Sequence, residues 1–208
     1  MATTSLTWGQ FKFYAGGWSG WQNLGSQSAT TSGNLAYTWL GRISTSAFDG
    51  DPKSLSIKVP FIRTGGQNTY GTISLYLYTS DPTNSITSGT PTPSGYISSG
   101  SANWNFNDQN YHTVTINMSN ATSIQPSKTY YILIRNTRDG ASSNVVIASN
   151  QTGTTYWSST LTYETGGKIW VKAGTSWKEG NAWVRISSGW KKSKAVWVKV
   201  NGTWRKSS

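Results

Sequence analysis

Residues 168–208 repeat one short pattern three times, and this repeat limits what the segment can fold into. Each unit has an apolar residue, Trp, Val and a basic residue, then four variable residues, then Trp and another basic residue. The first Trp recurs after 13 and then 14 residues, and so does the second. A period this short suits an array of β-hairpins rather than a helical solenoid. The three units are Ile169–Lys178, Ala182–Lys191 and Val196–Arg205.

Each unit is predicted to form a β-hairpin. Trp, Val and Ile favour strands, and the middle of each unit is small and polar. The third unit contains Asn201-Gly202, a strong signal for a two-residue hairpin turn. With these two residues as the turn, Val200 is expected opposite Thr203 and Lys199 opposite Trp204.

The same register applied to the first two units pairs Lys172 with Trp177 and Arg185 with Trp190. Side chains alternate along a strand, so each hairpin is expected to carry two Trp and one cation on one face. The candidate ligand-binding residues are Trp170, Lys172, Trp177, Trp183, Arg185, Trp190, Trp197, Lys199 and Trp204.

Two interpretations of these Trp residues stay open at the sequence level. In the first, they form the structural ladder of a small sheet, because a single hairpin is marginal and three must pack together or against a partner. In the second, they form a binding surface, because aromatic faces stack on sugars, bases or quaternary ammonium groups. A cation beside an exposed indole contributes about 0.5–1 kcal/mol.

The charge of +11 is unevenly distributed along the chain. Residues 168–208 hold ten Lys or Arg against Glu179 alone, whereas residues 1–167 hold eight against six acids. Gly166-Gly167 lies at this change in composition. We therefore expect a nearly neutral β-sandwich body, residues 1–165, followed by a basic tail of three hairpin repeats, residues 168–208.

The body is predicted to be all-β. Ile73, Leu75 and Leu77 alternate with polar residues, Val114 and Ile116 do the same, and Tyr130–Ile134 is dense enough for a central strand. Turn-rich breaks separate these runs, a pattern typical of a sandwich. Further candidate strands are Leu6–Tyr14, Leu35–Ile43, Ser54–Ile62, Val145–Ser149 and Thr155–Tyr163.

One long segment, Ser80 to Ser101, contains three prolines and three glycines with very little that is apolar. A loop this long is usually functional or mobile. The alternative is a surface excursion that covers an edge of the sheet.

The residues available for chemistry argue against catalysis. Cysteine is absent, which removes disulfides, thiolate nucleophiles and zinc–cysteine sites, and His112 is the single histidine. We interpret His112 as a structural residue at the start of a strand. Asp49-Gly50-Asp51 offers oxygens to calcium, but Asp-Gly is also a plain turn signal. We expect no enzymatic activity, no catalytic residues, no cofactor and no metal site.

The sequence resembles known proteins in two places. Over about residues 35–163 the sequence is similar to jelly-roll modules of the carbohydrate-binding-module kind. The resemblance rests on three segments in this order, with a Pro/Ser/Thr loop after the first: Gly71–Tyr78, Tyr111–Asn117 and Ile124–Ile134. The tail is similar to Trp-Lys repeats at the C-termini of minor structural proteins of tailed bacteriophages. Together the resemblances imply a jelly-roll-like body in a virion protein of the tail, baseplate, fibre or head-fibre class. They transfer no catalytic or ligand residue.

We therefore expect a non-enzymatic structural component of a bacteriophage virion, assembled in the host cytoplasm, that contributes to binding host-surface glycans. Expected partners are other virion proteins, further copies of the chain, and a host polysaccharide or teichoic acid. The alternatives are a cell-envelope carbohydrate-binding module and a virion protein that binds nucleic acid. The tail has the charge and aromatics of single-strand binders, but the body does not share them, so nucleic acid is the weaker expectation. The start of the chain resembles no secretory signal, and no apolar run approaches the ~20 residues of a membrane helix.

Overall fold

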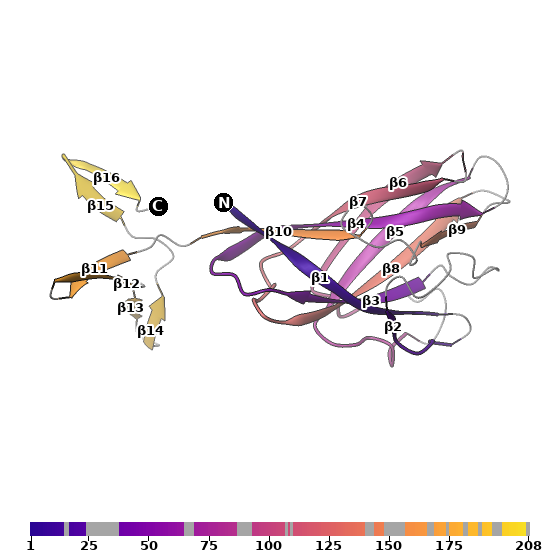
Figure 1. The fold of residues 1–208 in the computed structure, drawn as a ribbon, viewed down its shortest axis with the longest axis horizontal. Helices are drawn as coiled ribbons and strands as arrows, with labels where there is room; N and C mark the ends of the chain where they lie inside the picture. The colour runs from indigo at the N-terminus through magenta and orange to yellow at the C-terminus, as the bar shows by residue number, and fades with distance from the viewer. Residues whose placement is uncertain are drawn as a thin grey trace. The chain divides into compact units, whose positions relative to one another are not determined.

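The computed structural model describes the chain except for residues 15–16, 24–37, 65–68, 87–92, 107, 109, 140–143, 148–156, 166–168, 174, 181–182, 187–188, 193–196 and 207–208. For some strand residues, many of them in the tail, it describes the backbone alone. Within that description every regular element is a β-strand and no helix occurs (Figure 1). The predicted all-β class is confirmed.

The chain divides into two compact units. The first comprises Met1–Phe48 and Pro52–Tyr163, and the second comprises Asp49–Asp51 and Glu164–Ser208. The division along the chain thus falls between Tyr163 and Glu164, with one short turn, Asp49–Asp51, also grouped in the second unit.

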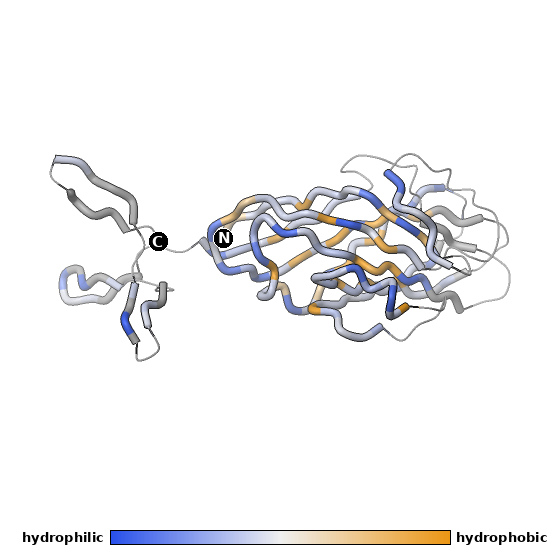
Figure 2. Tube along the Cα trace, turned by 90° about the horizontal axis from the view of Figure 1, so that it is seen from below, coloured by the Kyte–Doolittle hydropathy of each residue, from blue (hydrophilic) through white to orange (hydrophobic). Residues whose placement is uncertain are grey.

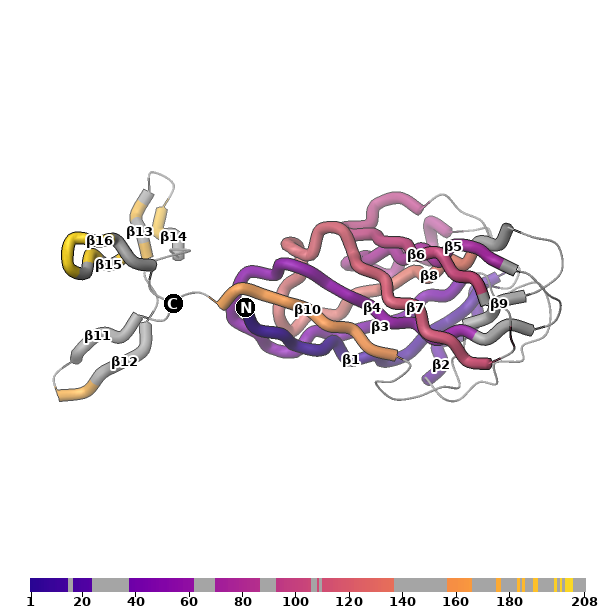
Figure 3. Tube along the Cα trace, turned by 90° about the horizontal axis from the view of Figure 1, so that it is seen from above, coloured from indigo at the N-terminus to yellow at the C-terminus, as the bar shows by residue number. Residues whose placement is uncertain are grey.

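The body forms one ten-stranded sheet in the order β6-β5-β8-β3-β1-β10-β4-β7, with β2 beside β1 and β9 beside β4. Its first strand belongs to both layers of the sandwich, because Ala2–Ser5 pairs with β10 and Leu6–Phe13 pairs with β3 (Figures 1 and 3). The strands are β1 Ala2–Phe13, β2 Gln22–Asn23, β3 Thr38–Thr45, β4 Asp51–Thr64, β5 Thr69–Tyr78, β6 Ser98–Phe106, β7 Tyr111–Met118, β8 Thr129–Asp139, β9 Asn144–Ile147 and β10 Ser158–Glu164.

The main core lies between the layers and follows the predicted alternation. Ile73, Leu75 and Leu77 on β5 are fully buried in it, and Val114 and Ile116 on β7 are buried in it too. Figure 2 shows hydrophobic positions alternating with hydrophilic ones along the strands of the body. Each fully buried Leu or Ile stabilises the fold by about 1.5–3 kcal/mol relative to exposure.

Strand β8 is central, as predicted, because it pairs with β5 on one side and β3 on the other. Its apolar run is dense because both of its faces are covered. Ile132 and Ile134 belong to the main core, whereas Leu133 belongs to a second cluster on the outer face.

Strand β6 was missed by the sequence analysis, which included its start in a long loop. Its first residues, Ser98–Ser101, are small and polar and carry no alternating apolar signal. A Cβ on Gly100 would collide with the backbone carbonyl of Asn117, so the close approach of β6 to β7 requires a residue without a side chain. Ser119 N donates to Ser99 O at 2.7 Å, which nearly closes the sheet on itself.

The first part of the segment between β5 and β6 packs on the outer face of the sheet. Ile86 is buried with Leu40, Tyr78 and Leu133, and its carbonyl accepts a hydrogen bond from the Trp18 indole at 2.9 Å. A surface excursion is therefore present at Ser80–Ile86, but it covers the outer face of the interior strands β5, β8 and β3 and not, as the sequence analysis had it, an edge of the sheet. Residues 87–92 of the segment lie outside the described residues.

The tail consists of three separate two-stranded antiparallel sheets, as predicted for the fold class. Their strands are β11 Ile169–Ala173 with β12 Ser176–Gly180, β13 Trp183–Ile186 with β14 Gly189–Lys192, and β15 Trp197–Val200 with β16 Thr203–Lys206.

Candidate binding surfaces

The predicted register of the hairpins is confirmed in all three. Lys172 pairs with Trp177, Arg185 with Trp190 and Lys199 with Trp204. In the third hairpin Asn201 and Gly202 form the turn with φ of 50° and 82°. Both values are positive, as the tight turn that matches strand twist requires, and Asn and Gly are the residues that adopt them at least cost.

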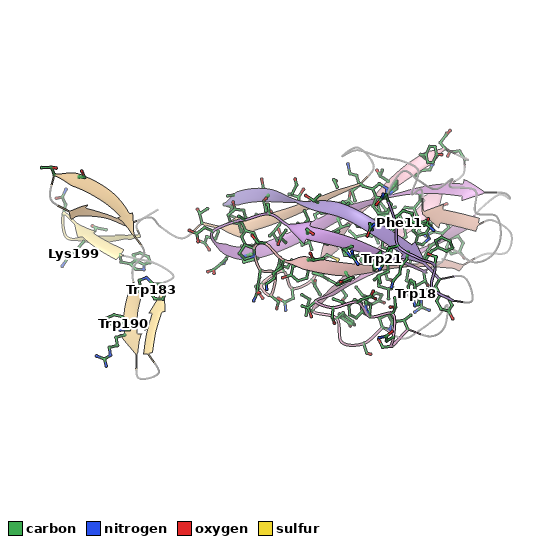
Figure 4. All side chains as sticks on the ribbon, turned by 60° about the horizontal axis from the view of Figure 1, so that its bottom comes forward. Phe11, Trp18, Trp21, Trp183, Trp190 and Lys199 are labelled. Carbon is green, nitrogen blue, oxygen red and sulfur yellow. The ribbon has the colours of Figure 1, made fainter. Side chains whose placement is uncertain are left out.

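The tail presents Trp to solvent at the three positions where the Trp side chain is described. Trp183, Trp190 and Trp197 are 56%, 66% and 56% exposed, and the side chains of Arg185 and Lys199 are exposed as well. Figure 4 shows Trp183 and Trp190 on the second hairpin and Lys199 on the third. Exposed indoles are what the binding-surface interpretation expects, and the binding role itself stays a prediction.

Four of the nine candidate residues have a described backbone position only. Trp170 and Lys172 lie on β11, Trp177 on β12 and Trp204 on β16. Their register places them at positions equivalent to those of the exposed residues, but their side chains lie outside the described residues.

The register also identifies residues that the sequence analysis did not select. Lys192 pairs with Trp183, Lys206 pairs with Trp197, and Glu179 occupies the equivalent position opposite Trp170. The repeat template ended at the basic residue directly after the second Trp, one position before these three. Continuing the strand alternation by one residue would have found them.

A second aromatic and cationic cluster lies on the body, where Lys12 crosses from β1 to the outer face. Its ammonium nitrogen lies 4.6 Å from the Trp21 ring centroid and 5.5 Å from that of Trp18. The Arg42 guanidinium lies 4.3 Å from the same Trp21 ring and 5.7 Å from the Tyr131 ring. Figure 4 labels Trp18 and Trp21. Lys12 is buried, so its charge fastens the segment around Trp18–Trp21 onto the sheet and does not face a ligand.

Tyrosines extend this outer face toward the loop before β6. Tyr96 contacts Tyr76 and Tyr78 edge-on, with ring centroids 5.1 Å and 6.4 Å apart. Burial, reinforced by the two neighbouring tyrosines, raises the pKa of Tyr78 to about 12. Tyr78 therefore stays neutral across the physiological range and serves packing.

A pocket of about 460 Å³ lies on the body where β5 meets β6. Tyr70 lies at the edge of this pocket and is 54% exposed, and Thr72 Oγ1 donates to the side-chain amide oxygen Oδ1 of Asn103 at 3.0 Å. An exposed ring beside amides and a hydroxyl can stack on a sugar and hydrogen-bond its hydroxyls. The lining residues are Tyr70, Gly71, Thr72, Asn103, Trp104 and Asn105.

The single histidine and the carboxylates are the side chains that catalysis or metal binding would use. His112 Nε2 lies 2.6 Å from Asp108 Oδ1 at the start of β7, and this hydrogen bond, followed by one from the Asn110 amide, holds the pKa of Asp108 below its usual range. His112 therefore has a hydrogen-bond partner at the start of β7, and its structural role stays a prediction. Within the described ranges, His, Asp and Glu nowhere gather in a group of three that would hold a metal ion.

In the same described ranges, no helix has the length and apolar content of a membrane span. No protein-family model matches the chain, and neither the curated proteins nor the solved structures give a significant match.

Proposed function

We propose that the protein is a non-enzymatic structural component of a bacteriophage virion whose tail hairpins bind an anionic polymer of the host envelope. The observation that supports the binding role most strongly is the exposure of Trp183, Trp190 and Trp197 beside cations set by the hairpin register. Membership of a virion is supported by the resemblance of the repeats to Trp-Lys repeats of phage structural proteins. Further copies of the chain and other virion proteins are the proposed partners.

Two interactions would hold such a polymer on the tail: electrostatic attraction and stacking on the indoles. Positive charge attracts it over a range that salt shortens, to a Debye length of about 8 Å at physiological ionic strength. Stacking on the indoles acts at contact and is nearly independent of salt. The tail concentrates both interactions, since it carries ten cations, one acid and six of the chain's 12 Trp in 41 residues.

Truncation tests the role of the tail. A variant that ends at residue 165 retains the whole main core, so its thermal unfolding confirms whether the body is folded. We expect the folded truncated protein to lose binding to purified host envelope. Undiminished binding would place the receptor surface on the body, and the tail repeats would then serve docking to other proteins. Mass spectrometry of purified phage particles tests the virion assignment independently, and absence of the protein there would contradict it.

A second candidate function, a carbohydrate-binding module, is favoured by the pocket at Tyr70. A neutral oligosaccharide would stack on the exposed ring and bond the amides of Asn103 and Asn105. Tyr70→Ala should then abolish binding of the body to that glycan in a glycan array, whereas Tyr111→Ala, at another exposed tyrosine, should leave it unchanged. Equal binding by both variants would remove this candidate.

A further inference from the structure

The three hairpins are not equivalent, although their repeats look alike. In the second hairpin the register pairs are Arg185 with Trp190 and Trp183 with Lys192. In the third they are Lys199 with Trp204 and Trp197 with Lys206. Each of these two hairpins therefore carries four positions, here called its Trp face, at which two Trp and two cations occupy opposite diagonals.

The first hairpin breaks this arrangement at one position. Lys172 pairs with Trp177 as expected, but Trp170 pairs with Glu179. The four positions of its Trp face therefore carry one cation and one anion, with no net charge. The Trp face of the second hairpin carries two positive charges, and so does that of the third.

The diagonal arrangement determines what kind of chain can lie across it. Residues directly opposite in an antiparallel pair have Cβ atoms about 4.5–5.5 Å apart, and diagonal neighbours lie about 7–8 Å apart. Because the two Trp lie on one diagonal, the nearest Trp-face neighbour of each Trp is a cation, both along its own strand and directly opposite on the paired strand. A polymer crossing the ribbon in either direction meets an indole and a positive charge in alternation.

This alternation fits one of two classes of anionic polymer better than the other. In a single-stranded nucleic acid the bases project to one side of the sugar–phosphate chain, so its binding surfaces need a row of aromatics beside a row of cations. In an acidic polysaccharide the sugar rings and the anionic groups follow each other along the same line. The diagonal pattern matches the second class.

We infer that the second and third hairpins are the binding units of the tail and that their ligand is an anionic polysaccharide in which sugar rings alternate with phosphodiester or carboxylate groups. This inference rests on the proposed function. The first hairpin, whose Trp face Glu179 leaves without net charge, does not bind this ligand.

Charge-reversal variants of the full-length protein test the inference. The double variant Lys192→Glu/Lys206→Glu gives the second and third Trp faces the charge pattern of the first. The matched control is Lys191→Glu/Arg205→Glu, which makes the same change in net charge at adjacent residues. These residues pair with Val184 and Val198, so strand alternation assigns them to the opposite side of the ribbon. A third variant, Glu179→Lys, gives the first hairpin the pattern of the other two.

Binding is measured by calorimetry to a poly(N-acetylhexosamine 1-phosphate), to oligothymidylate with the same number of phosphates, and to neutral dextran. We expect Lys192→Glu/Lys206→Glu to weaken polysaccharide binding roughly tenfold or more, the control to weaken it less than about threefold, and Glu179→Lys to strengthen it. Wild-type protein should prefer the polysaccharide to oligothymidylate and ignore dextran. Circular dichroism of each variant checks that the hairpins remain folded.

The outcomes separate the inference from the function on which it rests. If wild-type protein binds neither anionic polymer, the proposed function fails. If it binds the polysaccharide but both double variants weaken binding equally, only net charge matters and the Trp-face inference is overturned. Tighter binding to oligothymidylate than to the polysaccharide would overturn the ligand class and make the tail a nucleic-acid binder.

Discussion

The ammonium nitrogen of Lys12 lies 2.9 Å from Oδ2 of Asp81, and the two ends of this ion pair are unequally buried. The Lys12 side chain is 8% exposed and that of Asp81 is 31% exposed. Lys12 also donates to Thr83 Oγ1 at 3.1 Å. The pair joins β1 to the start of the long segment between β5 and β6, and so fixes that segment on the sheet.

The unequal burial predicts unequal costs of removing either partner. Asp81→Asn leaves a buried cation without its counter-ion, whereas Lys12→Met leaves a carboxylate that still reaches water. We expect Asp81→Asn to lower the free energy of unfolding by about 2 kcal/mol and Lys12→Met by less than about 1 kcal/mol, both measured by urea unfolding. Lys128→Met, at an exposed lysine, controls for net charge. The reverse order of the two losses would contradict this account.

The same pair makes stability depend on pH. Burial alone would raise the pKa of Asp81, but hydrogen bonds from Lys12 and Thr83 hold it below its usual range. The stabilisation is therefore fully present above the unfolded carboxyl pKa of about 3.9 and is lost as pH falls through the lower folded pKa. Below about pH 4, urea unfolding should show a steeper loss of stability in wild type than in Asp81→Asn. Asp108, whose pKa is also lowered, titrates in both proteins, and parallel curves would rule out the assigned role of Asp81.

The sequence predicted those parts of the fold that alternation encodes locally. Ile73, Leu75 and Leu77 were assigned to one buried face because they follow the two-residue period of a strand. The Lys12–Asp81 pair could not be predicted, because its residues are 69 positions apart and a lysine in a strand is normally exposed. In the tail, the Trp–cation pairs were predictable because the turn fixes the register, whereas the exposure of each indole depends on packing that no repeat specifies.

The approach of β6 to β7 predicts that Gly100 tolerates no side chain. An added Cβ would collide with the Asn117 carbonyl oxygen and also contact Ile116, and a backbone atom within a paired strand cannot move away cheaply. We expect Gly100→Ala to lower the free energy of unfolding by about 1–3 kcal/mol. Gly20→Ala is the matched control, because its Cβ would meet no atom within 4 Å. Its expected effect in the same urea experiment is within about 0.5 kcal/mol, and a similar loss in both variants would count against this contact.

The turn of the third hairpin predicts local unfolding that leaves the body intact. Gly202 has a φ of 82°, a value at which a β-branched residue is strained by about 1–2 kcal/mol. An isolated two-stranded hairpin is marginally stable, so a cost of this size is enough to unfold it. In Gly202→Val we expect the amide resonances of Trp197–Lys206 to move to random-coil positions, while the melting temperature of the body stays unchanged. Thr203→Val, at the first residue of β16, should preserve the hairpin, because Val favours a strand. Native amide shifts in Gly202→Val would show that contacts outside the turn hold the hairpin together.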